Sequence, residues 1–134
     1  MTSVFYAYRD SPQRRAALTA APGAGERYVL FGMDELRTRG HAIRHSLERR
    51  GPARWAVVTG AAAKRGLELA GGYGGDFPSM FGSLREANRA DIVFSTVDTV
   101  GIPLLLSARG GRLRAPLVYT ARSVKPRASR FQSR

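Results

Sequence analysis

The segment from Gly71 to Leu106 constrains the fold more than any other part of the sequence. It contains a glycine-rich loop, a short amphipathic run, a five-residue apolar run, an abrupt turn at Thr96 to Asp98, and a second apolar run with the composition of a helix. Loop, helix, buried strand, turn and helix in this order are typical of a doubly wound α/β sheet. Ligands bind beyond the carboxyl ends of the strands in such sheets, so we place a candidate site in the turn after Ser95.

The same alternation extends over most of the chain. Periodicity and β-branched composition predict strands over residues 3–8, 41–47, 91–95 and 117–120, and helices over residues 26–39, 54–69, 78–88 and 98–108. A loop with one helical turn at Arg15 to Leu18 is expected between the first strand and the first helix. We therefore expect an α/β fold with a Rossmann-like parallel sheet of four strands flanked by helices, in one domain over residues 1–121. The apolar run Ile92 to Phe94 predicts a central strand covered on both faces.

Positive charge is concentrated near the end of the sequence. The chain of 134 residues carries a net charge of +12, but residues 1–98 hold 14 basic and 10 acidic side chains, whereas residues 99–134 hold 8 basic and none acidic. Nearly all the basic residues are arginine, a bias that a GC-rich coding sequence produces without any binding role. Basic residues do not alternate with aromatic ones as in base-stacking surfaces, so nucleic acid is not an expected partner. Residues 122–134 lack an apolar period and are predicted to be a disordered basic tail.

Several classes of protein are disfavoured by composition. The sequence contains no cysteine, which excludes disulfides and thiolate metal sites. No apolar run approaches the roughly 18 residues of a membrane span, and the first residues lack the pattern of a signal peptide. We interpret His41 as structural and His45 as a lone strand histidine, and no spacing indicates a catalytic set or a metal site. These observations favour a soluble cytoplasmic domain.

One glycine-containing segment, Val57 to Gly66, resembles two phosphate-binding fingerprints without completing either. A P-loop requires Ser or Thr after its lysine, but Arg65 follows Lys64. The short-chain dehydrogenase fingerprint directly follows the first strand of the sheet. Its middle glycine falls at the position that Lys64 occupies here. A nucleotide-binding oxidoreductase is therefore retained only as an alternative.

Three loops contain the candidate binding residues. Glycines near the first helix would let backbone N–H groups approach an anion, and the dense glycines of GGYGGD permit unusual backbone angles. Hydroxyls after the third strand could bind a sugar, although both aspartates of the set could instead cap helices. The candidate substrate-binding residues are Gly23, Gly25, Tyr73, Gly75, Asp76, Ser95, Thr96 and Asp98.

These strings resemble a known family. The helix YVLFGMDELRTRGH, the block GGYGGDF, and ADIVFSTVDTVGIPLL followed by PLVYTA look like the N-terminal half of bacterial GT-B glycosyltransferases, similar to glycosyltransferase family 4. The resemblance covers about Ser3 to Ala121. GGYGGDF and FSTVDTVGIP are its distinctive parts, and the rest is generic.

The resemblance implies a two-domain enzyme whose N-terminal domain binds a sugar or lipid-linked acceptor. The nucleotide-sugar donor and a Glu-x7-Glu signature belong to a C-terminal domain in this family, and the present sequence contains no such pair of glutamates. We therefore expect the acceptor-binding half of a glycosyltransferase, truncated after about Ala121 and inactive alone. Such enzymes often act at the inner face of the membrane, where a basic surface would suit peripheral contact with anionic lipid. A standalone α/β module that binds an anionic partner through its basic tail is the other alternative.

Overall fold

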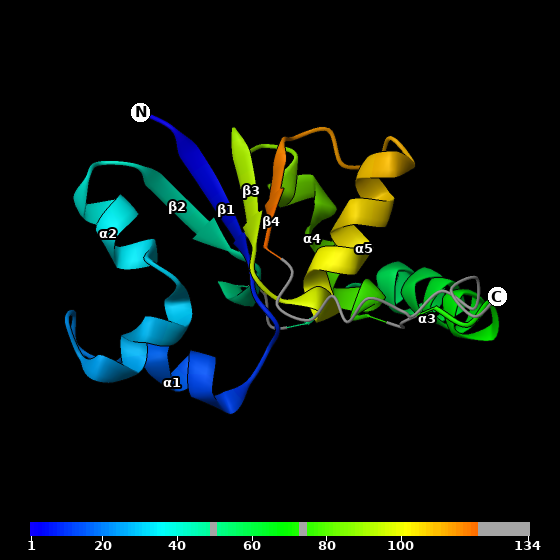
Figure 1. Cartoon of the computed structure of the whole chain (residues 1–134), viewed down its shortest axis with the longest axis horizontal. Coiled ribbons are helices and arrows are strands. Elements are labelled where there is room, and N and C mark those ends of the chain that lie inside the picture. The colour runs from blue at the N-terminus through cyan, green and yellow to red at the C-terminus, as the bar shows by residue number, and fades with distance from the viewer. Residues whose placement is uncertain (49–50, 73–74, 121–134) are drawn as a thin grey trace, which may run out of the picture.

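The computed structural model describes residues 1–48, 51–72 and 75–120. Four strands form one parallel sheet in the order β2-β1-β3-β4: β1 (Ser3–Ala7), β2 (Ala42–His45), β3 (Ile92–Ser95) and β4 (Leu117–Tyr119) (Figure 1). This arrangement confirms the predicted Rossmann-like α/β fold. Because β1 pairs with both β2 and β3, the chain first builds the sheet on one side of β1 and then on the other. The carboxyl ends of all strands meet at one edge.

Helices connect the strands of this sheet. The α-helices are α1 (Pro12–Thr19), α2 (Met33–Thr38), α3 (Arg54–Leu69), α4 (Phe77–Ala87) and α5 (Asp98–Arg109), and two short 3-10 helices are η1 (Gly25–Leu30) and η2 (Ser46–Glu48). The bounds of α3 are those predicted, and α4 and α5 differ from their predictions by one residue at most at each end. The tail over residues 122–134 lies outside the described residues, so its predicted disorder stays a prediction.

The expected loop after β1 contains a complete helix, α1, instead of a single turn. Ser11 is its N-cap, because its hydroxyl oxygen accepts a hydrogen bond from the Arg14 backbone N–H at 3.2 Å. Pro12 occupies the first helical position, where its missing N–H costs nothing. The prediction was wrong here because it treated Pro12 as a sign of loop structure.

The helix predicted over residues 26–39 is divided into η1 and α2. Phe31 and Gly32 between them have φ of 52° and 77°, in the left-handed region that interrupts a helix. The predicted apolar face is nevertheless correct, since Val29 and Met33 are buried and Leu36 packs beside them. The chain keeps this face against the sheet on both sides of the break.

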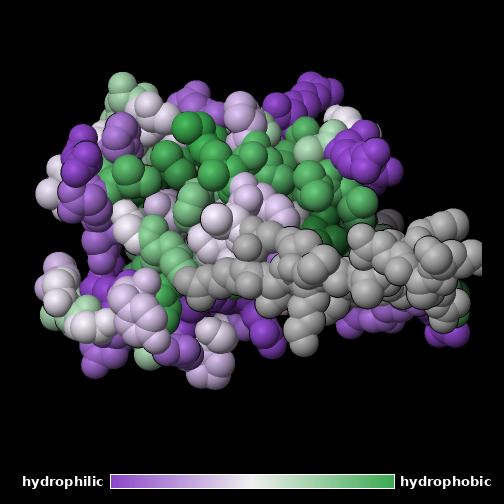
Figure 2. Space-filling model, in the orientation of Figure 1, coloured by the Kyte–Doolittle hydropathy of each residue, from purple (hydrophilic) through white to green (hydrophobic). Residues whose placement is uncertain are grey.

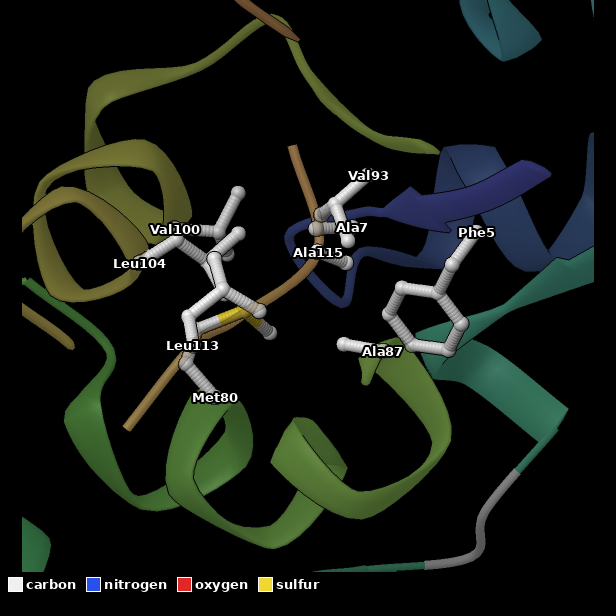
Figure 3. Close-up of a cluster of buried hydrophobic side chains, with 9 residues drawn as sticks. All are labelled: Phe5, Ala7, Met80, Ala87, Val93, Val100, Leu104, Leu113 and Ala115. Atoms are coloured by element: carbon white, nitrogen blue, oxygen red, sulfur yellow. The ribbon is translucent and has the colours of Figure 1, made fainter. Parts of the chain in front are cut away.

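The core lies in two clusters on opposite faces of the sheet. One cluster joins the α4 and α5 side chains Met80, Val100 and Leu104 to Phe5 and Val93 of the sheet (Figure 3). The other joins Ala17 of α1, Leu30 of η1 and Met33 of α2 to Val4 and Tyr6 on the opposite face. No helix of the described residues is both long and apolar enough to cross a membrane.

Helices cover the two faces of the sheet unevenly. β3 is a central strand, as predicted, and its Val93 is fully buried. On the other face, Ile92 and Phe94 are only half-buried, and Val118 of the neighbouring edge strand is 48% exposed. Hydrophobic surface is visible over this part of the molecule in Figure 2. The expectation that β3 is covered on both faces is therefore met only in part on the face that carries Ile92 and Phe94, where Phe94 packs against the second cluster but stays half-buried.

Candidate functional site

A polar cleft lies at the carboxyl edge of the sheet, where β1 and β3 are neighbours. This is the point at which the strand order reverses, the usual ligand crevice of an open α/β sheet. The cleft has a volume of about 330 Å³. Its lining comes from the segment after β1 (Arg9, Ser11, Gln13, Arg14), from η1 and its C-cap (Tyr28, Val29, Phe31) and from the segment after β3 (Val97, Thr99). We call this the switch-point cleft.

Arg14 is held rigidly at one side of this cleft. Its Nη1 donates to the Arg9 carbonyl oxygen at 2.9 Å. Its guanidinium carbon lies 5.7 Å from the ring centroids of both Tyr8 and Phe31, within the range of cation–π attraction. These contacts fix a positive charge beside the cleft while Arg9 remains exposed.

Tyr8 anchors η1, which forms another wall of the cleft. Its buried hydroxyl donates to the Leu30 carbonyl oxygen at 2.6 Å, and burial raises the pKa of the Tyr8 hydroxyl well above its usual value. Tyr28, two residues before Leu30, is 73% exposed and presents an aromatic ring to the cleft. The wall therefore combines a rigid backbone with an accessible aromatic side chain.

The electrostatics of the switch-point cleft favour an anion. Two arginines line it, and none of its described lining residues is Asp or Glu. The N-terminal residues of α1 also line it, and the N-terminus of a helix carries partial positive charge. Hydroxyls of Ser11 and Thr99 lie in the same lining and can bond to phosphate or sugar oxygens.

The predicted residues at the end of β3 and just after it lie next to the cleft but do not line it. Ser95 and Thr96 are 0% and 7% exposed, and the Ser95 hydroxyl lies 3.5 Å from the Val97 carbonyl oxygen. Asp98 is the first residue of α5 and makes no side-chain cap; its carboxylate accepts a hydrogen bond from the Tyr119 hydroxyl. Burial, followed by this bond, raises the pKa of Tyr119 to about 12. The bond between Tyr119 of β4 and Asp98 therefore joins α5 to the sheet.

Gly75 and Asp76 contact α5, so the two distinctive strings of the sequence pack together. Pro103 has no N–H to donate to Thr99, four residues earlier, and the Thr99 carbonyl oxygen instead accepts from the Asp76 N–H at 2.7 Å. A Cβ on Gly75 would lie 2.6 Å from the same oxygen. Asp76 also caps α4, as the capping alternative predicted, by accepting from the Ser79 N–H at 3.3 Å. Tyr73 lies outside the described residues.

The remaining glycine motifs are also away from the cleft. Gly23 and Gly25 follow α1 rather than β1, and neither lines the switch-point cleft. The segment Val57 to Gly66 lies within α3, so it is continuous helix rather than a phosphate-binding loop after a strand. This placement removes the motif on which the oxidoreductase alternative depended.

The switch-point cleft lies at the edge of the sheet that the sequence favoured for a site, but its lining residues were not predicted. Arg9, Ser11, Arg14, Tyr28 and Thr99 were not among the candidates. The signal for Ser11 and Arg14 was the pattern Ser-Pro-x-Arg shortly after a strand, which indicates a helix N-terminus facing the ligand edge. No sequence pattern indicated that Tyr28 would be exposed.

One of the two histidines, His41, precedes β2, and the other, His45, is its last residue. Within the described residues, no group of three His, Asp or Glu side chains is placed to hold a metal ion. His41 and His45 are half-buried, and burial lowers the pKa of His45 below its usual value.

No protein-family model matches the chain, and no curated protein or solved structure matches it either. The functional conclusion therefore depends on the fold and the cleft.

Proposed function

We propose that the chain is the acceptor-binding side of a GT-B glycosyltransferase and holds a phosphate-bearing acceptor in the switch-point cleft. The observation that carries this proposal is the position and charge of the cleft: two arginines and a helix N-terminus at the ligand edge of a Rossmann-like sheet. A lipid phosphate or a phosphorylated sugar has the charge that this lining complements. The nucleotide-sugar donor is assigned to a separate domain.

The aromatic and hydroxyl groups of the lining support a sugar or isoprenoid next to the phosphate. Tyr28 presents an exposed ring on which an apolar chain or a sugar face can pack. Ser11 and Thr99 offer hydroxyls at the same cleft. The phosphate is assigned to Arg9 and Arg14, since guanidinium groups bind phosphate oxygens in a bidentate manner.

Binding of phosphorylated and unphosphorylated probes tests this proposal. We expect calorimetry to show binding of farnesyl phosphate or glucose 1-phosphate to the full chain and little binding of farnesol or glucose. The lipid and sugar probes distinguish the two sources of phosphate. Arg9→Gln should weaken binding about tenfold, because it removes a charge-assisted hydrogen bond.

Arg39→Gln is the matched control. Arg39 is also exposed, but it pairs with Glu35 at 2.9 Å near the amino edge of the sheet, so its loss should leave affinity unchanged. Equal affinity for phosphorylated and unphosphorylated probes would contradict the proposal, as would equal losses in the two variants.

A further inference from the structure

Helix α3 carries large apolar side chains on the side that faces solvent. Trp55, Val58 and Leu69 are 56%, 70% and 80% exposed. With exposed Ala62 they are spaced by three, four and seven residues, so they lie on one face of the helix, with Arg65 between Ala62 and Leu69. We call these four residues the α3 stripe. Hydrophobic side chains of this size usually face the core, so the stripe indicates a contact with something outside the described residues.

The opposite side of α3 is packed against the rest of the domain. Ala56 and Gly60 are buried there, and α3 makes most of its contacts with α4. The helix lies at the periphery of the molecule, at the far side of α4 from β1 (Figure 1). The stripe therefore belongs to a helix that projects from the sheet rather than to an incompletely packed core.

Positive charge adjoins the stripe. Arg54 and Arg65 are four and seven residues from Val58, so they lie on the same side of the helix. Both are exposed, and neither makes an ion pair with a described residue. Lys64 pairs with Glu68 at 4.0 Å, so the acidic residue of α3 is already occupied.

These features fit an anionic lipid surface better than a second copy of the chain. Stable protein interfaces bury about 800 Å² on each partner, far more than four side chains on one convex helix provide. A second copy would also bring its own net charge of +12 close to these arginines. Anionic lipid instead complements the arginines, and tryptophan favours the boundary between headgroups and acyl chains.

We propose that the chain docks on anionic membranes by laying the α3 stripe into the headgroup boundary, with Arg54 and Arg65 against lipid phosphates. The stripe is separate from the switch-point cleft, so this proposal does not depend on acceptor binding. It specifies the surface for membrane contact that a basic composition alone leaves undefined.

Trp55 is the only tryptophan in the chain and reports directly on this contact. Vesicles containing phosphatidylglycerol should bind the full chain and shift its tryptophan emission to shorter wavelength, whereas phosphatidylcholine vesicles should do neither. The double variant Val58→Ser/Leu69→Ser should weaken binding at least tenfold, and Arg54→Gln/Arg65→Gln should weaken it and reduce its salt dependence. Leu105→Ser removes a leucine that is 44% exposed on α5 and should bind like the unaltered chain.

Three results would overturn the proposal. Binding that survives Val58→Ser/Leu69→Ser, with the variant's circular dichroism unchanged, would show that the stripe is not the contact. Sedimentation with vesicles without any shift of Trp55 emission would place the contact elsewhere. Sedimentation velocity showing a dimer that the double variant dissociates would assign the stripe to a second copy.

Discussion

At the scale of single residues, His45 shows how a polar group can serve the fold without serving a site. Its ring lies 6.2 Å from that of Tyr8, and its Nε2 lies 3.9 Å from a Glu48 carboxylate oxygen. Burial lowers the pKa of His45 and outweighs the raising effect of Glu48, while Arg37 lowers it further. The neutral imidazole is therefore the form that this half-buried position favours.

This environment makes stability depend on pH. The folded pKa of His45 is below its unfolded value near 6.5, so between the two values the unfolded state binds more protons. The free energy of unfolding should fall as pH drops from 7 through the folded pKa, by at most about 1.4 kcal/mol per pH unit for one proton. Urea denaturation at several pH values should show this slope in the unaltered chain and in His41→Gln, and a smaller slope in His45→Gln. An unchanged slope in His45→Gln would contradict this assignment.

At the scale of elements, the bounds of helices and strands were predicted most accurately where the apolar period of the sequence is continuous. The core strands and α3, α4 and α5 were located within a residue or two because their patterns match one face of a helix or a buried strand. The break at Phe31 was missed because it is a backbone change that leaves the apolar period intact. The role of the glycines in α3 was also invisible, since only the packed structure distinguishes them.

Gly60 and Gly66 of α3 provide a matched pair for this distinction. A Cβ on Gly60 would lie 2.5 Å from the Pro78 backbone nitrogen, whereas a Cβ on Gly66 would meet nothing within 4 Å. Gly60→Ala should destabilise the fold by about 1–3 kcal/mol through overpacking of α3 on α4. Gly66→Ala should stabilise it by up to about 1 kcal/mol, because alanine favours helix. Chemical denaturation measures both, and effects of the same sign would refute the close approach of α3 to α4.

At the scale of the whole molecule, strand order decides where function is expected. The sequence predicted parallel strands and hence a ligand edge, but it could not predict that β1 and β3 would be neighbours. That pairing brings Arg9 to the same cleft as Thr99, 90 positions apart in the chain. Long-range strand pairing of this kind leaves no local pattern in the sequence. The carboxyl edge of the sheet could therefore be predicted, but the residues that line the switch-point cleft could not.

The proposed division of labour between two domains leads to a prediction about catalysis. Sugar transfer requires donor and acceptor to be held with their reacting atoms about 3–3.5 Å apart. If the switch-point cleft holds only the acceptor, the 134-residue chain should bind a phosphorylated acceptor without transferring sugar to it. Incubation with farnesyl phosphate and radiolabelled UDP-glucose or GDP-mannose should yield no labelled lipid. A titration with NAD or NADP should show no binding, because the resembling motif lies within α3. Labelled product that Arg9→Gln reduces would show that this chain binds donor and acceptor together, and would refute the assignment of the donor to a separate domain.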